Sequence, residues 1–179
     1  MEKALNKKIL YKGKILNLRV DEVIFDDDRT ATREIIEHNE AIVVVPVLDD
    51  KKIVMVKQYR YAVGEELLEL PAGTLEKGET PIECAKRELL EETGYRAQKV
   101  EELTSFYSSP GFCTEKIYLF LATGLEKKEQ KLDSDERIKV EIHSVEDLKE
   151  KIKTGNLRDA KSVAGILYYI LFCSNERTS

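Results

Sequence analysis

The sequence has few of the residues that build disulfide frameworks or zinc sites. It contains three cysteines, Cys84, Cys113 and Cys173, and none of them belongs to a Cys-x-x-Cys pair. An odd number of scattered cysteines predicts neither a disulfide framework nor a zinc cluster. Only two histidines are present, His38 and His143, so a histidine nucleophile or a histidine-based metal site has little support. A reducing cytoplasm is the expected location.

Long apolar runs and an excess of positive charge are also missing. No apolar run approaches the roughly 20 residues that a membrane-spanning helix needs. The basic start, MEKALNKKILYKGK, is not followed by the continuous apolar segment of a signal peptide. The formal net charge is −5, whereas a sequence-independent nucleic-acid binder normally presents a basic surface. We therefore expect neither a membrane nor a nucleic acid as a partner.

The composition is that of a globular domain of mixed secondary structure. The chain has 179 residues, of which 42% are hydrophobic, enough for one cored domain with a small appendage. Alternating and β-branched residues predict three antiparallel strands within residues 1–39, with a hairpin turn at Asp26-Asp27-Asp28. So small a sheet is barely stable alone and must pack either on its own domain or on a second subunit.

Residues 40–179 are expected to form the second domain. The nearly continuous apolar run 41–48 predicts a buried strand, and the segment 53–60 predicts another. Ser144 resembles the N-cap of one helix, and a last helix is expected over 159–172. Because strands and helices mix without strict alternation, the predicted class is α+β.

The clearest helix lies within residues 73–95. Thr80 is a suitable N-cap, Pro81 follows at the first helical position, and Glu83 completes a capping box. Gly94 is a suitable left-handed C-terminal stop. At about 100° per residue, Ile82, Ala85 and Leu89 share the stripe that should face the core.

Three carboxylates crowd the C-terminal end of this helix. Glu88 and Glu92 are four residues apart and lie one above the other, while Glu91 lies farther round, within reach of Arg87. The helix macrodipole is also negative there, so the cluster favours a bound cation. Hard oxygen ligands suit magnesium, with manganese as a second option. Taken alone, a glutamate-rich helix is more often simply solvated.

The complete pattern resembles the Nudix box. That signature is Gly, five residues, Glu, seven residues, then Arg-Glu-aliphatic-x-Glu-Glu-x-Gly-aliphatic. Its matches in this chain are Gly73, Glu79, Arg87, Glu88, Leu89, Glu91, Glu92 and Gly94, with Tyr95 as the one departure. The resemblance implies a Nudix fold, in which a mixed β-sheet is sandwiched between helices, here with an N-terminal antiparallel sheet.

The resemblance also implies roles for the matched positions. Glu88 and Glu92 would bind a divalent metal, Glu91 would bind or support it, and the carbonyl of Ala72 would be a further ligand. Glu79 and Arg87 would brace the loop and the helix. Metals in such a site neutralise the diphosphate, polarise phosphorus and lower the pKa of a bound water.

Features outside the box resemble the ADP-ribose pyrophosphatase group of this family. These are the segment LLELPAG and a proline sixteen residues beyond the final glycine of the box, which is Pro110 here. Taken alone, Ser-Ser-Pro-Gly is ordinary turn chemistry. The resemblance implies that two arginines and the residues around this proline contact substrate, namely Arg33, Arg60, Ser109, Pro110, Gly111 and Glu115.

The catalytic base is expected outside the helix. The segment LDSDERIKV places Asp133, Asp135 and Glu136 just before a strand and resembles the acidic loop of the group. Glu136 is our choice as base or additional metal ligand, with Glu91 as a second catalytic candidate. Ser134 stands where some relatives have an acidic residue, and a merely solvated loop is the alternative.

The resulting expectation is a homodimeric, magnesium-dependent hydrolase that converts ADP-ribose to AMP and ribose 5-phosphate. Two alternatives stay open. One is a Nudix hydrolase of another nucleoside diphosphate sugar, such as GDP-mannose. The other is a domain that binds ADP-ribose without cleaving it, although such domains usually lose box glutamates and all are present here.

Overall fold

The computed structural model describes residues 1–132 and 137–174, and the chain divides into two compact units. Unit 1 comprises Met1–Glu40 and Phe106–Lys116, and unit 2 comprises Ala41–Ser105 and Ile117–Ser179. The segment Phe106–Lys116 belongs with unit 1 because its backbone pairs there. The Ile36 N–H donates to the Phe112 carbonyl at 2.7 Å, and the Thr114 N–H donates to the Ile36 carbonyl at 3.0 Å.

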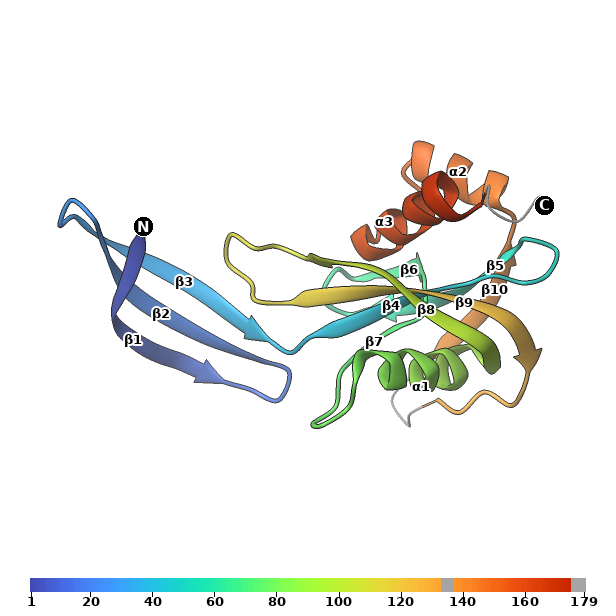
Figure 1. The fold of residues 1–179 in the computed structure, drawn as a ribbon, viewed down its shortest axis with the longest axis horizontal. Helices are drawn as coiled ribbons and strands as arrows, with labels where there is room; N and C mark the ends of the chain where they lie inside the picture. Colours follow the sequence, from blue (N-terminus) through green and yellow to red (C-terminus); the bar gives the residue numbers. More distant parts are fainter. Residues whose placement is uncertain (133–136, 175–179) are drawn as a thin grey trace. The chain divides into compact units, whose positions relative to one another are not determined.

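Unit 1 is built on a three-stranded antiparallel sheet in the order β1-β2-β3, which confirms the expected N-terminal sheet (Figure 1). Its strands are β1 (Glu2–Lys12), β2 (Leu16–Phe25) and β3 (Thr30–His38). The predicted turn is present, with Asp28 at φ 63° and the Phe25 N–H donating to the Arg29 carbonyl at 2.8 Å. Every residue of β1 is exposed.

Unit 2 contains two sheets. One is mixed, in the order β7-β4-β9-β8, with β4 antiparallel to β7 and parallel to β9. The other is antiparallel, in the order β10-β5-β6. The strands are β4 (Ala41–Pro46), β5 (Ile53–Arg60), β6 (Glu65–Glu69), β7 (Ala72–Thr74), β8 (Tyr95–Tyr107), β9 (Lys116–Lys127) and β10 (Ile138–His143).

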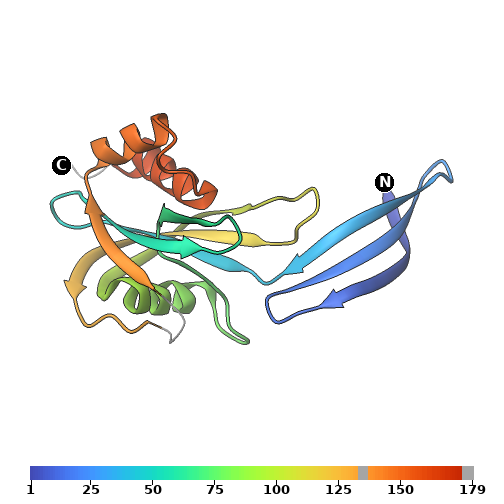
Figure 2. The same cartoon turned by 180° about the vertical axis from the view of Figure 1, so that it is seen from behind.

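Helices cover both sides of the unit 2 sheets, with α1 on one side and α2 and α3 on the other (Figures 1 and 2). They are α1 (Pro81–Thr93), α2 (Val145–Lys153) and α3 (Ala160–Tyr168), and α3 runs on into the π-helical turn η1 (Tyr169–Cys173). The predicted α+β class, with a mixed sheet between helices, is therefore confirmed. Within the described residues, no helix is long and apolar enough to cross a membrane.

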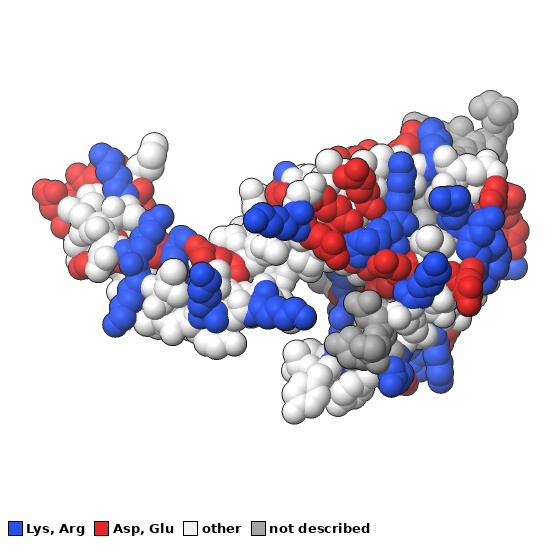
Figure 3. All heavy atoms as spheres, turned by 90° about the horizontal axis from the view of Figure 1, so that it is seen from below, with Lys and Arg blue, Asp and Glu red and all other residues white. Residues whose placement is uncertain are grey.

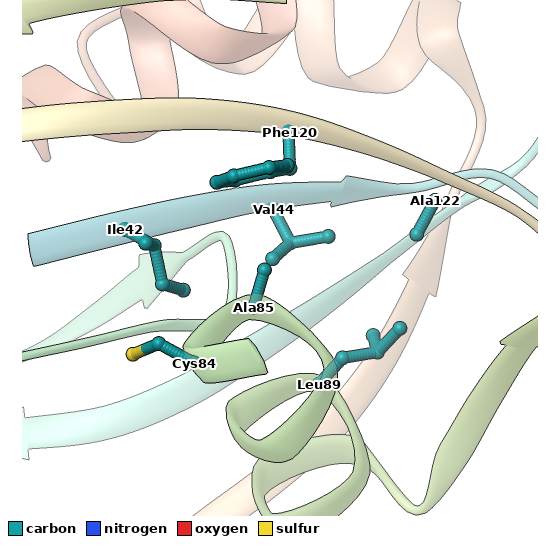
Figure 4. Packing of buried hydrophobic residues seen from close by; sticks show 7 residues of the cluster. All are labelled: Ile42, Val44, Cys84, Ala85, Leu89, Phe120 and Ala122. Atoms are coloured by element: carbon teal, nitrogen blue, oxygen red, sulfur yellow. The ribbon is translucent and has the colours of Figure 1, made fainter. Parts of the chain in front are cut away.

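Strand β4 supplies the centre of the core because both of its faces are covered. All of its residues are buried, as its continuous apolar sequence predicts. Ile42 and Val44 point towards α1 and pack in one cluster with Cys84, Ala85 and Leu89 (Figure 4). This packing fixes α1 against the sheet.

Two sequence expectations need correction. Ile82 was placed on the buried stripe of α1, yet it is 39% exposed, and Cys84 is buried in the core instead. The expectation for Ile82 came from its angle around the helix alone, whereas the residues of α1 that join the core cluster are Cys84, Ala85 and Leu89. The last helix was expected to continue regularly through 172, but it changes to π-helical bonding at Tyr169.

Candidate active site

The loop and helix of residues 73–95 form the frame of the site. Helix α1 starts as its sequence predicts: Thr80 is the N-cap, and its N–H donates to the Glu83 carboxylate at 2.9 Å. The helix ends at Gly94, whose φ of 67° is left-handed and whose N–H donates to the Leu90 carbonyl. Local sequence thus fixes both ends of α1, and this sets the direction in which Glu88, Glu91 and Glu92 point.

Arg87 is the centre of a cluster of carboxylates. Its Nε and Nη2 donate to the two oxygens of Glu79 at 2.8 and 2.9 Å, a bidentate pair that joins the helix to the preceding loop. Its Nη1 donates to Glu88 at 2.7 Å and to Glu91 at 3.1 Å. The guanidinium therefore holds Glu88 and Glu91 close together despite their like charge.

Two close approaches attach the cluster to the strand end before the loop. A Cβ at Gly73 would lie 1.9 Å from Oε1 of Glu88, so only glycine leaves room for that carboxylate. The Ala72 N–H donates to Oε2 of Glu92 at 3.0 Å, and Glu92 is only 3% exposed. Ala72, Glu88 and Glu92 are thus gathered where β7 meets α1.

The electrostatics of the cluster follow from Arg87. Its hydrogen bond lowers the pKa of Glu79 from 4.5 to about 2. The pKa of Arg87 is raised in turn, first by Glu79 and then by Glu88 and Glu91. Burial raises the pKa of the Cys84 thiol to about 12, so this cysteine stays protonated and serves the core.

The donor set suits a hard divalent cation. Glu88, Glu91, Glu92 and the Ala72 carbonyl are all oxygen ligands, the type that magnesium and manganese prefer. Within residues 1–132 and 137–174, no three acidic, histidine or cysteine side chains form a ready metal cage. Arg87 engages two of the carboxylates, so an incoming ion would share Glu88 and Glu91 with this guanidinium. The oxygen ligands, and the space that Gly73 leaves for the Glu88 carboxylate, fit a metal that draws these groups together.

Opposite charges lie side by side elsewhere on the molecule too. On the face seen in Figure 3, Lys and Arg side chains are interspersed with Asp and Glu side chains. An anionic substrate would therefore depend on a local cation or on particular arginines for its attraction to this acidic protein.

Arg60, expected to contact substrate, lies at the end of β5 in a network that the sequence analysis did not find. Its Nε and Nη2 donate to the two oxygens of Glu69 at 2.7 and 2.8 Å. Glu69 also accepts from Lys161 at 2.6 Å, and Lys161 donates to Asp159 at 2.8 Å. The sequence does contain one indication of this network, the single acidic residue Glu69 between Leu68 and Leu70. A charge buried among apolar residues needs partners.

The other expected substrate contacts lie in unit 1. Arg33 pairs with Glu2 across the sheet, with Nη2 2.6 Å from Oε1. Glu115 lies 3.6 Å from Nδ1 of His38. The Ser109 carbonyl accepts from the N–H groups of Phe112 and Cys113, at 3.1 and 2.9 Å. These bonds shape the exposed turn that carries Pro110 and Gly111, which the sequence motif had indicated.

The expected base, Glu136, and its neighbours Asp133, Ser134 and Asp135 lie outside the described residues. Their roles stay predictions. Of the two catalytic candidates, only Glu91 can be located, on the outer side of α1, where its side chain is 39% exposed.

Several known proteins are similar to this chain in sequence or in fold. Two relatives each cover 93% of this chain and 91% of their own length: an ADP-ribose pyrophosphatase of Bacillus subtilis at 41% identity and a methanol dehydrogenase activator of Bacillus methanolicus at 40%. A GDP-mannose pyrophosphatase of Cronobacter sakazakii is 35% identical over 70% of each chain. The crystal structure of an ADP compounds hydrolase matches the fold with a TM-score of 0.85 at 20% identity, covering 94% of this chain and 92% of that one.

The family model of the NUDIX domain matches residues 37–165, which include the loop, helix α1 and its carboxylates. Because that match spans most of the sequence, and relatives near 40% identity align along almost their whole length, this chain belongs to the NUDIX family.

Proposed function

We propose that this protein hydrolyses ADP-ribose to AMP and ribose 5-phosphate. The observation that carries the proposal is the pair Glu88 and Glu91 held by Arg87, with Glu92 held by the Ala72 N–H on the same helix, in a chain 41% identical to an ADP-ribose pyrophosphatase. The reaction adds water across the phosphoanhydride: one P–O bond breaks, one forms, and the two monophosphates separate. Attack at either phosphorus gives the same products.

The metal is proposed to be Mg²⁺, with Mn²⁺ as a substitute, held by Glu88, Glu91, Glu92 and the Ala72 carbonyl. When bound, such an ion neutralises the diphosphate and lowers the pKa of a coordinated water. Two contacts support this proposal: Arg87 holds Glu88 and Glu91 near each other, and the Ala72 N–H holds Glu92 beside β7. Glu79 pairs with Arg87 and stabilises this arrangement without touching substrate.

Proton transfer and substrate binding are assigned to residues around this centre. We propose Glu136 as the base that takes the proton of the attacking water, or as a further metal ligand, with Glu91 as the alternative base. Arg33 and Arg60 are proposed to contact the substrate, since a planar guanidinium binds phosphate oxygens well. Ser109, Pro110, Gly111 and Glu115 are proposed to contact its terminal ribose.

Two properties of the whole protein belong to the same proposal. The exposed strand β1 supports a homodimer. The free state of Cys84, Cys113 and Cys173 supports action in a reducing cytoplasm.

A second candidate substrate is GDP-mannose, which is favoured by the 35% identical relative that bears its name. The metal cluster would serve either compound, because both contain the same diphosphate. The choice rests on groups that contact the sugar and the base.

The test is product analysis with purified protein and magnesium. We expect AMP and ribose 5-phosphate from ADP-ribose, loss of hydrolysis in excess chelator, and recovery when magnesium is restored. Full hydrolysis in chelator would reject the metal assignment. A specificity constant at least tenfold higher for GDP-mannose or for a dinucleotide would reject ADP-ribose as the substrate and leave the family assignment intact. Binding of ADP-ribose without any product would indicate a non-catalytic domain.

A further inference from the structure

Glu69 is a buried carboxylate to which the box assigns no role. It is 1% exposed at the end of β6, and burial alone would raise its pKa. The hydrogen bond from Arg60 and the charge of Lys161 overcome that effect, so its pKa is lowered and it stays ionised. A buried charge destabilises the fold unless it is paired, so Arg60 and Lys161 are constrained to stay beside Glu69.

The partner with an exposed surface is Arg60. Its side chain is 41% exposed, whereas that of Lys161 is 19% exposed. Glu69 uses both oxygens to engage Nε and Nη2 of Arg60, which fixes the plane of the guanidinium. Within the described part of the chain, the remaining nitrogen, Nη1, makes no hydrogen bond to another residue. One edge of the guanidinium is therefore held by the protein and the other is available to a ligand.

Arg60 also lies within electrostatic reach of the acidic helix. Its pKa is raised first by the hydrogen bond to Glu69 and further by the charges of Glu92 and Asp159. Glu92 is one of the proposed metal ligands, and it belongs to the same compact unit as Arg60.

The base of this network is well anchored. Asp159 is the N-cap of α3 and accepts from the Ser162 N–H at 3.0 Å. The Oγ of Ser162 accepts from the Leu70 N–H at 2.7 Å. Lys161, between these two residues, reaches Glu69. The start of α3 thus fixes both the carboxylate and the residue that follows it.

We infer that Glu69, supported by Lys161, is a positioning residue that orients Arg60 to receive a phosphate oxygen of the substrate. The inference rests on the proposed function, in which Arg60 contacts a nucleoside diphosphate sugar. A preordered arginine loses less side-chain freedom on binding than a mobile one, so the contribution of Glu69 should affect substrate affinity.

The test is a double-mutant cycle with Arg60→Gln, Glu69→Gln and the double variant, assayed with ADP-ribose and with GDP-mannose. We expect each single variant to raise KM about tenfold and to change kcat less than about threefold, as loss of uniform binding does. The double variant should lie within about twofold of Arg60→Gln, because Glu69 acts only through Arg60. Glu65→Gln is the matched control, since Glu65 is on the same strand and pairs with Arg158 in an exposed position.

Several outcomes would overturn the inference. The first is a double variant in which the effects of the two single substitutions on KM multiply. The others are a fall in kcat at unchanged KM, and wild-type kinetics for Glu69→Gln. If Glu69→Gln does not fold, Glu69→Asp replaces it under the same criteria, because it keeps the charge and shortens the reach. If the wild-type protein hydrolyses GDP-mannose and not ADP-ribose, ADP-ribose is rejected as the substrate, and the cycle is then scored on GDP-mannose. Activity on neither compound would reject both proposals.

Discussion

At the scale of single residues, the buried glutamate of α1 provides the sharpest test of the metal site. Glu92→Gln keeps the side-chain shape but removes the charge of a proposed ligand. We expect kcat/KM for ADP-ribose to fall on the order of 100-fold or more, since one group lost from an electrostatic centre costs roughly 10² to 10³ in rate. Circular dichroism should report a folded protein.

The matched control is Glu83→Gln on the same helix. Glu83 is exposed and belongs to the capping box, where glutamine also serves, so both stability and activity should be nearly unchanged. A Glu92→Gln variant with near wild-type turnover would show that Glu92 is not a metal ligand.

The pair of Glu79 and Arg87 predicts a dependence of stability on pH. In the folded protein the pKa of Glu79 is about 2, against an ordinary value of 4.5. The unfolded chain therefore takes up a proton first as the pH falls, so the pair stabilises the fold above about pH 4.5, and this contribution is lost towards about pH 2.

Thermal unfolding measured between about pH 6 and about pH 2 tests this assignment. The Tm of Glu79→Gln should fall less steeply on acidification than that of the wild type. Glu76→Gln, a change at an exposed glutamate of the same loop, should keep the wild-type slope. Parallel profiles for Glu79→Gln and the wild type would contradict the assignment.

At the scale of elements, the end of α1 depends on more than a left-handed residue. Gly94 has a φ of 67°, and a Cβ there would lie 3.0 Å from the Gln130 nitrogen and the Lys128 oxygen, both backbone atoms. Gly155, after α2, has a φ of 72° and nothing within 4 Å. Alanine at either position should cost about 1 kcal/mol for its conformation. At Gly94, crowding should add about 1 to 3 kcal/mol.

Chemical denaturation of Gly94→Ala and Gly155→Ala separates the conformational cost from the crowding, because only the new methyl group at position 94 contacts the backbone of residues 128–130. Equal losses would mean that this backbone moves aside easily. A larger loss at Gly94 would show that the C-terminal end of the acidic helix is clamped, which keeps Glu91 and Glu92 in place.

Elements with strong local signals were predictable from sequence. The capping box at Thr80, the stop at Gly94 and the apolar run of β4 each depend on neighbouring residues, and all three are present in the structure. The expected burial of Ile82 was wrong, because its angle around the helix does not by itself determine whether it reaches the core. The pairing of Glu69 with Arg60 and Lys161 was not predicted, since Arg60 meets Glu69 only once β5 and β6 pair, and Lys161 lies 92 residues farther along the chain.

At the scale of the whole molecule, unit 1 raises the question of what covers strand β1. Strand β1 and the turn after it leave large apolar side chains exposed by more than half, namely Leu5, Ile9, Leu10, Tyr11 and Ile15. An isolated three-stranded sheet is only marginally stable, and this much apolar exposure on one strand is typical of an interface. A second copy of the chain is the occupant that we predict.

Light scattering at micromolar concentration should give about 41 kDa, twice the chain mass of 20.5 kDa. Ile9→Lys should shift the mass towards that of the monomer, because a buried charge without a partner destabilises an interface. Asn6→Lys, which adds the same charge to the same strand without removing an apolar group, should shift it less. A wild-type mass of 20.5 kDa would refute the dimer. A dimer that both variants leave intact would assign the interface to a surface other than β1.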